Sequence, residues 1–362
     1  MKILGIVGAR PNFMKIAPLL REMRRHPQIS TVLIHTGQHY DPEMSDFFFR
    51  DLEIPLPDLH LGVGSGSQAA QTGKVMVAFE AVLEKSDADL VLVVGDVNST
   101  LACSVVAAKA GVPVAHVEAG LRSFDRSMPE EINRIVTDAL ATYHFTTSRD
   151  ADENLLREGA KREGIFFVGN VMIDTLLRFS EKSEASSVRS DLSLDGDYAL
   201  MTLHRPSNVD EAAPLRRIFR ALEVLGKNLP IVFPVHPRTR RMLEEFGIST
   251  APDGLRMVDP LGYLDFIHLE KHARLVLTDS GGIQEETTVL GVPCLTLREN
   301  TERPVTLTQG TNVLVGNSTE RIVEEATRIL RGGGAPRRVP ELWDGNASER
   351  IVSVLRKIGG VA

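Results

Sequence analysis

Short apolar runs alternate with amphipathic segments along most of the chain. The run "KILGIVG" precedes "NFMKIAPLLREMRR", and "DLVLVVG" precedes "STLACSVVAAKAG". The apolar runs are continuous, which is typical of strands that are buried on both faces of a parallel sheet. Strands that alternate with helices in this way indicate βα units. The pattern therefore predicts an α/β fold with doubly wound parallel sheets.

Two distant passages repeat the same layout. Residues 89–120 and 273–300 each run through a strand, an Asp-bearing turn, a helix, the tripeptide Gly-Val-Pro and another strand. This long-range similarity differs from the short-period repeats of solenoids and predicts two doubly wound domains in tandem. We place the first domain at 1–170 and the second at 171–345. A last helix is expected at 346–362, with Asn346 as its N-cap and Glu349 at N3.

The composition narrows the class of protein. The chain has 362 residues, of which 43% are hydrophobic, and its net charge of −7 with no long basic run argues against a nucleic-acid partner. Cys103 and Cys294 lie among apolar neighbours, so we expect buried thiols in a reducing compartment. No signal peptide is recognisable, and no apolar stretch nears the roughly 18 residues of a membrane span. We expect a cytoplasmic protein with no membrane partner.

A glycine-rich turn follows the apolar run of residues 275–277. The sequence there reads "TDSGGIQEE", and a helix is expected to begin directly after the glycines. Backbone N–H groups and the helix dipole at such a turn can bind phosphate, and the carboxylates of Glu285 and Glu286 are candidates to hold sugar hydroxyls. An ordinary βα turn with an acidic first helical turn would look the same. Ser280, Gly281 and Gly282 are the candidate phosphate-binding residues.

Basic residues and histidines also follow predicted strands. Ligands of open α/β sheets bind outside the carboxyl ends of the strands, so these side chains are candidates to contact an anion. A histidine at a strand end can also act as an acid or a base near neutral pH. For Arg10 and Lys15, the alternative is that they are solvated cations at the start of a helix. The set comprises Arg10, Lys15, His204, Arg205, His236 and Arg303.

Three carboxylates occupy comparable positions. Asp96 follows "LVLVVG", where it either caps the next helix or remains available for chemistry. Glu118 ends a predicted strand, a position where an unpaired carboxylate is rare and a functional role is favoured. His116, two residues earlier, is expected to be a core histidine whose ring is hydrogen-bonded. Glu130 forms an S-x-x-E capping box with Ser127, which is the favoured reading from the local pattern.

Common cofactor and metal motifs are missing from the sequence. No G-x-x-x-x-G-K-[ST] occurs, and no G-x-G-x-x-G follows the first strand, which disfavours a P-loop NTPase and a standard NAD enzyme. No H-E-x-x-H and no carboxylate-rich loop with metal spacing occurs. We therefore expect neither a cofactor nor a metal ligand set.

Taken together, these residues resemble a known family. The chain is similar to the non-hydrolysing UDP-N-acetylglucosamine 2-epimerases from residue 3 to about residue 315, and the order and spacing of the motifs agree. The resemblance implies the GT-B fold, in which two Rossmann-like domains face a central cleft and the last helix returns to the first domain. The shared motifs are "GARPNFMKIAPL", "TGQHYDPEMS", "GDVNSTLA", "HVEAGLRSFDRSMPEEINR", "TLHRPSN", "PLGYLDF", "TDSGGIQEE" and "TERPVT".

The resemblance also implies a reaction and its residues. Members interconvert UDP-GlcNAc and UDP-ManNAc without metal or nicotinamide, by eliminating UDP to 2-acetamidoglucal and adding it back, and they form homodimers. Matching motifs assign Asp96, Glu118, Glu130 and His204 to catalysis, and Glu130 thereby changes from a cap to a catalytic candidate. The residues implied for UDP are Arg10, Lys15, Ser280, Gly281, Gly282 and Arg303 on the diphosphate, Glu286 on the ribose and Phe266 near the uracil.

The sequence departs from the best-known bacterial members in four places. The segment between Arg122 and Pro129 is about two residues short, and Pro206-Ser207, Pro237-Arg238 and Leu261 replace other residues. The short segment and "PLGYLDF" also resemble relatives that act on UDP-2,3-diacetamido-2,3-dideoxyglucuronate. A 2-epimerase acting on that sugar or another modified UDP-HexNAc is therefore one alternative. A GT-B glycosyltransferase, which would need an acceptor, is another.

Overall fold

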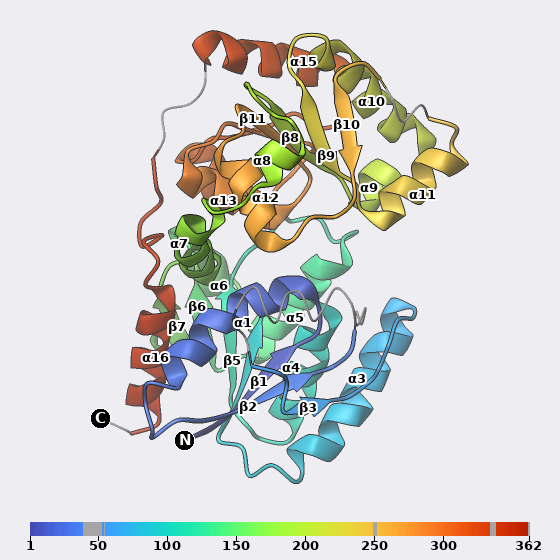
Figure 1. The fold of residues 1–362 in the computed structure, drawn as a ribbon. Helices are drawn as coiled ribbons and strands as arrows, with labels where there is room; N and C mark the ends of the chain where they lie inside the picture. Colours follow the sequence, from blue (N-terminus) through green and yellow to red (C-terminus); the bar gives the residue numbers. More distant parts are fainter. Residues whose placement is uncertain (39–52, 54, 249–251, 334–337, 361–362) are drawn as a thin grey trace. The chain divides into compact units, whose positions relative to one another are not determined.

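The computed structural model describes residues 1–38, 53, 55–248, 252–333 and 338–360, and the chain divides into two compact units (Figure 1). The N-terminal unit comprises Met1–Leu177 and Glu341–Ala362, and the C-terminal unit comprises Arg178–Pro340. The first division falls inside helix α7 (Val171–Ser183), whereas the sequence places a boundary after residue 170. The second division falls before residue 341 in the structure, whereas the sequence places it after residue 345.

The N-terminal unit is built on a seven-stranded sheet in the order β3-β2-β1-β4-β5-β6-β7. All the paired neighbours run parallel. Every residue of β4 is buried, as the continuous apolar run predicts. The strands are β1 (Lys2–Val7), β2 (Ser30–His35), β3 (Leu59–His60), β4 (Leu90–Val94), β5 (Val114–Ala119), β6 (Tyr143–Thr146) and β7 (Ile165–Phe167).

The C-terminal unit repeats the plan with a six-stranded sheet in the order β10-β9-β8-β11-β12-β13. Its paired strands are also parallel. The prediction of two α/β units with parallel sheets is confirmed. The strands are β8 (Ala199–Thr202), β9 (Ile231–Pro234), β10 (Leu255–Val258), β11 (Leu275–Thr278), β12 (Cys294–Thr296) and β13 (Asn312–Leu314).

Helices connect the strands and cover the sheets (Figure 1). Those of the N-terminal unit are α1 (Arg10–Met23), α3 (Gln68–Leu83), α4 (Asn98–Lys109), α5 (Pro129–Leu140), α6 (Arg149–Arg157), the start of α7, and α16 (Ala347–Ile358). Those of the C-terminal unit are α8 (Val188–Asp191), α9 (Pro206–Val209), α10 (Ala212–Gly226), α11 (Pro237–Glu245), α12 (Tyr263–Lys271), α13 (Gly281–Leu290), α14 (Val305–Thr308) and α15 (Thr319–Arg328). None of the helices in the described ranges has the length and apolar composition that a membrane crossing needs.

Strand order reverses once in each sheet, between β1 and β4 and between β8 and β11. In open α/β sheets, ligands bind beside the carboxyl ends of the strands at this switch point. The turns that follow β1 and β4 carry Arg10 and Asp96, and the turns that follow β8 and β11 carry His204 and Ser280. Each unit therefore gathers candidate residues at its own switch point.

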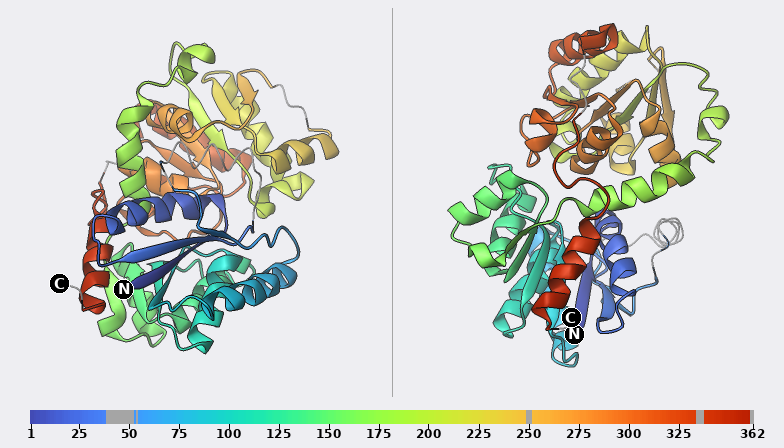
Figure 2. Two further views of the ribbon diagram at one scale, coloured as in Figure 1. Left: turned by 60° about the horizontal axis from the view of Figure 1, so that its bottom comes forward. Right: turned by 90° about the vertical axis from the view of Figure 1, so that its left-hand side faces the viewer.

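The last helix of the chain belongs to the N-terminal unit, where α16 packs beside α1 (Figure 2). Asn346 is the N-cap residue of this helix and Glu349 is at N3, as predicted, but the Asn346 side chain does not cap the helix with a hydrogen bond. Asp174 of α7 does so instead. Its two carboxylate oxygens accept hydrogen bonds from the backbone N–H groups of Ala347 and Ser348, at 3.0 and 2.7 Å. A cap from another helix ties the end of the chain to this unit.

We predict that Asp174→Ala lowers the free energy of unfolding by about 1–3 kcal/mol, because it leaves two buried N–H groups of α16 without an acceptor. Asn346→Ala is the matched control and should change the stability by less than about 0.5 kcal/mol. Urea denaturation of both variants at pH 7 provides the measurement. Equal effects of the two substitutions would contradict the assignment of Asp174 as the cap.

Candidate functional site

In the N-terminal unit, Asn12 holds the turn that follows β1. Its side-chain oxygen accepts hydrogen bonds from the N–H groups of Gly8 and Ala9, at 3.1 and 3.0 Å, and its amide nitrogen donates to the carbonyl of Val94 at 3.0 Å. These bonds join the turn after β1 to the end of β4. Arg10 is the first residue of α1, but its side chain lies outside the described part of the structure.

Lys15 and Glu118 form a buried ion pair at the carboxyl end of β5. Their residues are 6% and 4% exposed. Glu118 has a φ of +72° and lies at an irregularity in the pairing of β5 with β6. A non-glycine residue in this conformation is uncommon and is often found at a functional site. Gly95 leaves room for the pair, because a Cβ atom there would lie 2.8 Å from Nζ of Lys15.

Arg134 of α5 holds two acidic side chains. Its Nη1 atom lies 2.5 Å from Oδ2 of Asp96, and its Nη2 atom lies 2.6 Å from Oε2 of Glu131. Glu131 also accepts hydrogen bonds from the backbone of Ser123 and Phe124, at 3.0 and 2.8 Å. Burial by itself raises the pKa of Glu131, but the backbone donors and Arg134 outweigh burial and lower it. The Asp96 carboxylate is therefore fixed by a buried cation.

The local prediction for Glu130 is wrong. Helix α5 begins at Pro129 with Met128 as its N-cap, and the cap makes no side-chain hydrogen bond. Ser127 instead donates to Oδ1 of Asp125 at 2.6 Å, so no capping box forms. Glu130 lies in the first turn of α5, half-buried, with no hydrogen-bond or ion-pair partner among the described residues. Its carboxylate is therefore available for a role other than capping.

His116 is a hydrogen-bonded core histidine, as predicted. The ring is fully buried, with Nδ1 2.6 Å from Oδ1 of Asp138 and Nε2 2.8 Å from the carbonyl of Gly95. Burial raises the pKa of Asp138, but His116 and Arg122 together lower it below its usual value. His116 thus fixes the turn that carries Asp96.

In the C-terminal unit, a buried carboxylate organises the turn after β8. Asp279 accepts hydrogen bonds from the backbone N–H groups of His204 and Arg205, at 3.1 and 2.8 Å, and from the side-chain amide of Asn208 at 3.2 Å. Nδ1 of His204 lies 3.1 Å from Oδ1 of the same carboxylate. Burial raises the pKa of Asp279, but His204 and the backbone donors outweigh it and lower the pKa. His204 is therefore oriented by an ionised partner.

The glycine turn after β11 opens helix α13. Ser280 is the N-cap, and its side chain makes no capping hydrogen bond, so it does not occupy the N–H groups of the first helical turn. Gly281 is buried, and a Cβ atom there would lie closer than van der Waals contact to Nη1 of Arg303 and 2.9 Å from Oε1 of Glu302. Gly282 follows and is half-exposed. The arginine therefore lies over the start of the helix because Gly281 has no side chain.

Three arginines surround the buried carboxylate of Glu302. Arg303 forms an ion pair with it, Nη2 of Arg298 lies 2.7 Å from Oε2, and Nη2 of Arg205 lies 3.7 Å from Oε1. Burial raises the pKa of Glu302, but the three cations outweigh it and hold the pKa well below its usual range. Arg303 also donates to Oε1 of Glu285 at 2.7 Å. Three guanidinium groups and two carboxylates therefore lie together beside the start of α13.

His236 and Phe266 complete the predicted set. His236 is the N-cap of α11, where its Nδ1 atom accepts a hydrogen bond from the N–H of Arg238 at 3.2 Å. Its ring centroid lies 6.0 Å from that of His204, so the two predicted histidines are neighbours. Phe266 lies in α12. It is partly buried and packs against a hydrophobic cluster that includes Leu200 of β8 and Val276 of β11.

Glu286 belongs to a buried acidic pair. Its Oε1 atom accepts a hydrogen bond from the hydroxyl of Tyr263 at 3.2 Å. Burial and the nearby Glu285 raise the pKa of Glu286 to about 8. Glu270 is fully buried, and burial and the charge of Glu286 raise its pKa well above the usual value. Among the described residues, no cation forms an ion pair with these carboxyls as arginine does with Glu302, so the pair retains a proton at neutral pH.

Three comparisons with known proteins agree with these features. The family model described as UDP-N-acetylglucosamine 2-epimerase matches residues 21–356. A Methanococcus maripaludis protein named UDP-N-acetylglucosamine 2-epimerase homolog is 45% identical, with 99% of this chain and 100% of that protein covered. The crystal structure of Methanocaldococcus jannaschii UDP-GlcNAc 2-epimerase in complex with UDP-GlcNAc and UDP has a TM-score of 0.91 and 42% identity, with 99% and 100% covered.

The chain belongs to the UDP-N-acetylglucosamine 2-epimerase family. The predicted family, its enzyme class and its two-unit α/β fold are thereby confirmed. A further member of similar identity is named for another sugar. The UDP-2,3-diacetamido-2,3-dideoxy-D-glucuronate 2-epimerase of Pseudomonas aeruginosa is 43% identical, with 99% of this chain and 100% of that protein covered.

In this epimerase family member, the structure brings each group of predicted residues together within its own unit. Lys15, Glu118 and Asp96 lie near the Gly95 turn, and His204, Arg205 and Arg303 lie near the start of α13. The sequence analysis missed the residues that hold them. All three of these residues lie inside the quoted motifs, namely Arg134, Asp279 and Glu302. A search of the motifs for charged residues close in sequence to the predicted site residues would have found them.

The acidic pair gives a prediction about stability. Carboxyls with raised folded-state pKa values bind more protons in the folded than in the unfolded state, so their stabilisation is present below the unfolded pKa near 4.5 and is lost as the pH rises toward 8. Glu270→Gln removes one of these groups. We compare the free energy of unfolding of this variant with that of the wild type at each pH. We expect this difference to shift in favour of the variant by more than about 1 kcal/mol between pH 5 and pH 8.

Urea denaturation at the two pH values measures this difference. Glu80→Gln, on the exposed surface of α3, is the control and should show no such pH dependence. The same relative stability of Glu270→Gln at both pH values would show that the carboxyls do not share a proton.

Proposed function

We propose that the protein interconverts UDP-GlcNAc and UDP-ManNAc by inverting C2 of the sugar. Family membership supports this substrate class, as does the structural similarity to an epimerase crystallised with UDP-GlcNAc and UDP. The observation that carries the proposal is the set of carboxylates at the ends of β4 and β5 and the start of α5, together with the arginines beside the start of α13. The first group suits proton transfer, and the second suits binding of a diphosphate.

The proposed reaction has two steps, the elimination of UDP and its re-addition. In the first, a carboxylate takes the proton from C2 while the bond between C1 and the diphosphate oxygen breaks, which gives 2-acetamidoglucal and UDP. In the second, a carboxylic acid delivers a proton to the other face of C2, and the diphosphate oxygen bonds again to C1. The C2 hydrogen is not acidic, so its removal must be concerted with the departure of UDP. Cations that stabilise the leaving diphosphate therefore lower the barrier.

We assign the proton transfers to Asp96, Glu118 and Glu130, with His204 beside the diphosphate. The pairs Lys15–Glu118 and Arg134–Asp96 support this assignment, because each fixes a carboxylate in one position. Glu130 lacks a partner among the described residues, and like Asp96 it is half-buried, whereas Glu118 is buried. A mechanism that needs protons on two faces of one carbon requires at least two such groups.

The remaining predicted residues are proposed to bind UDP. The first-turn N–H groups of α13, from Ser280 to Gly282, would face the diphosphate together with Arg303. The carboxyl of Glu286 would hold the ribose, and Phe266 would lie near the uracil. Additional diphosphate contacts are proposed for Arg10, Lys15, Arg205 and His236. Lys15 already forms an ion pair with Glu118, so the same cation would serve both the carboxylate and the diphosphate.

A second substrate is supported by a specific comparison. The Pseudomonas aeruginosa relative named for UDP-2,3-diacetamido-2,3-dideoxy-D-glucuronate is as similar to this chain as the Methanocaldococcus jannaschii enzyme, at 43% identity for each. The same carboxylates would then act at C2 of the diacetamido uronate. We further propose a cytoplasmic homodimer, which the family resemblance implies and which sedimentation velocity of the purified protein tests.

The decisive experiment is incubation of the protein with UDP-GlcNAc in D2O, followed by proton NMR. We expect UDP-ManNAc to appear and deuterium to enter C2 of both sugars, because the acid that reprotonates C2 exchanges with solvent. A parallel incubation uses the diacetamido uronate. Turnover of that sugar alone would favour the second substrate, and free ManNAc with UDP would contradict the non-hydrolysing reaction.

The amide variants Asp96→Asn, Glu118→Gln and Glu130→Gln should each lower the rate of deuterium exchange by about 10²- to 10⁴-fold, the usual contribution of a general acid or base. Glu80→Gln is the matched control and should retain full activity. A variant that keeps wild-type exchange removes that carboxylate from the mechanism.

Gly281→Ala tests the UDP-binding assignment. The new methyl group would displace the guanidinium of Arg303, and the loss of one charged hydrogen bond to a phosphate corresponds to about 1.5–3 kcal/mol, or roughly 10- to 100-fold in UDP affinity. Isothermal titration with UDP measures this change. Gly196→Ala, where a Cβ atom would meet open space, serves as the control. Unchanged UDP affinity in Gly281→Ala would place the diphosphate elsewhere.

A further inference from the structure

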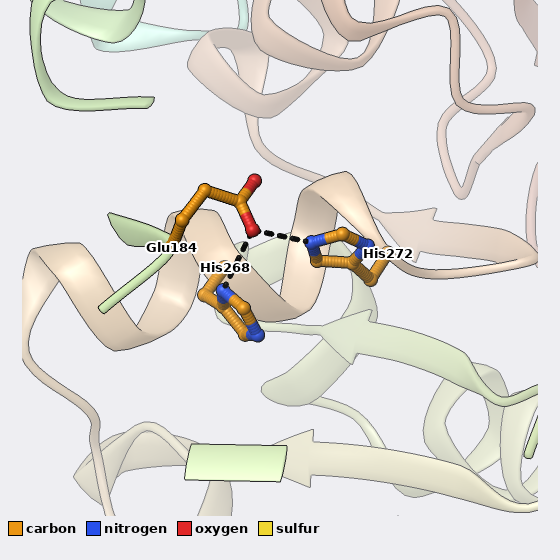
Figure 3. A group of neighbouring side chains, drawn as sticks. All are labelled: Glu184, His268 and His272. Carbon is orange, nitrogen blue, oxygen red and sulfur yellow. Dashed lines mark hydrogen bonds and ion pairs between the residues drawn. The ribbon is translucent and has the colours of Figure 1, made fainter. Parts of the chain in front are cut away.

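Two histidines and a glutamate, none of them assigned to the reaction, meet on the C-terminal unit (Figure 3). Glu184 directly follows α7, whereas His268 and His272 lie one helical turn apart at the end of α12. Residues four apart on a helix project from the same side. The cluster therefore joins the segment after α7 to the end of α12.

The donor atoms of the cluster converge. Nε2 of His272 lies 3.2 Å from Oε2 of Glu184, and Nδ1 of His268 lies 4.0 Å from the same oxygen. One donor atom from each residue can be chosen so that all three lie within 4.8 Å of one another. Figure 3 shows both rings directed toward the carboxylate.

One of these atoms is not explained by the protein's own contacts. His268 is only 8% exposed, and its Nδ1 atom is buried with no hydrogen-bond partner among the described residues. A buried polar atom without a hydrogen bond is destabilising. The Oε1 atom of Glu184 is occupied by Nζ of Lys271 at 2.5 Å, which leaves Oε2 for the side of the carboxylate that faces the histidines.

The chemistry of the three donors suits a transition-metal ion. Zn²⁺ binds two histidines and one glutamate in several proteins, with a water molecule in the fourth position, whereas Mg²⁺ and Ca²⁺ prefer oxygen ligands throughout. The expectation of no metal ligands rested on the absence of an H-E-x-x-H motif and of a carboxylate-rich loop. Such local motifs do not include Glu184, which is remote in sequence from the two histidines.

The geometry requires little movement. Ligands in tetrahedral zinc sites lie about 2.0–2.2 Å from the metal and hence roughly 3.3–3.6 Å from one another. The distance between His272 and Glu184 is already within about 0.3 Å of this range, and the distance between His268 and Glu184 exceeds it by less than 1 Å. The Glu184 side chain is 45% exposed and the His272 side chain 33%, so both can rotate toward an ion.

We propose that Glu184, His268 and His272 form a binding site for a divalent transition-metal ion of the Zn²⁺ type, which clamps the segment after α7 to α12. The ion satisfies Nδ1 of His268 and adds a cross-link within the C-terminal unit. Lys271 keeps the other oxygen of Glu184 and weakens the site through its positive charge. Because the ion binds the folded form, it stabilises that form.

The test uses metal-free full-length protein without a histidine tag. Zn²⁺ is titrated against a chromophoric chelator, and Co²⁺ absorption reports the coordination geometry. We expect one equivalent to bind, a higher melting temperature with Zn²⁺, and no comparable effect of Mg²⁺. His272→Ala and Glu184→Ala should each weaken binding by at least about tenfold. Lys271→Gln should strengthen it.

His26→Ala is the matched control, because His26 lies 3.1 Å from Glu22 at the same i, i+4 spacing but without a second histidine. This variant should bind Zn²⁺ like the wild type. Two outcomes would overturn the proposal: no stoichiometric Zn²⁺ binding by the wild type, or binding that survives both His272→Ala and Glu184→Ala. The second result would locate the ion elsewhere, for example beside His204 and His236.

Discussion

Carboxylates buried at the ends of parallel strands must be neutralised, and this constraint governs both halves of the protein. Lys15 neutralises Glu118, and three arginines surround Glu302. Removing one partner from such a pair leaves an uncompensated buried charge, which is far more destabilising than the pair itself is stabilising. The pairs therefore contribute little net stability but fix the positions of charged groups at the edge of each sheet where ligands bind.

The protein neutralises buried acids in two ways, and the difference has consequences for function. Arginine keeps Glu302 ionised, whereas Glu270 and Glu286 have no such cation within the described ranges and retain a proton instead. An ionised carboxylate beside arginines holds these cations in place for an anion. A protonated carboxyl can both donate and accept a hydrogen bond, which suits a sugar hydroxyl if Glu286 holds the ribose.

The sequence predicts the fold well because the main signal is local. Continuous apolar strands and strand-end polar residues indicate two parallel α/β units, and the candidate residues do gather within each unit. The partners are not predictable from local patterns, since Asp279 meets His204 and Asp174 meets Ala347 only through tertiary packing. The same limit explains the wrong capping box at Glu130, because an S-x-x-E match does not reveal that Ser127 prefers Asp125.

Helix α12 carries residues of both proposed binding sites in the C-terminal unit, the ribose site at Glu286 and the metal site. Its first turn carries Tyr263, which donates to Glu286, and its last turn carries His268 of the proposed metal cluster. Both side chains lie on one helix of nine residues. Coupling between the two ends requires two arrangements of α12 whose equilibrium both ligands bias. If an ion at the last turn changes the affinity for UDP in this way, UDP must change the affinity for the ion by the same factor.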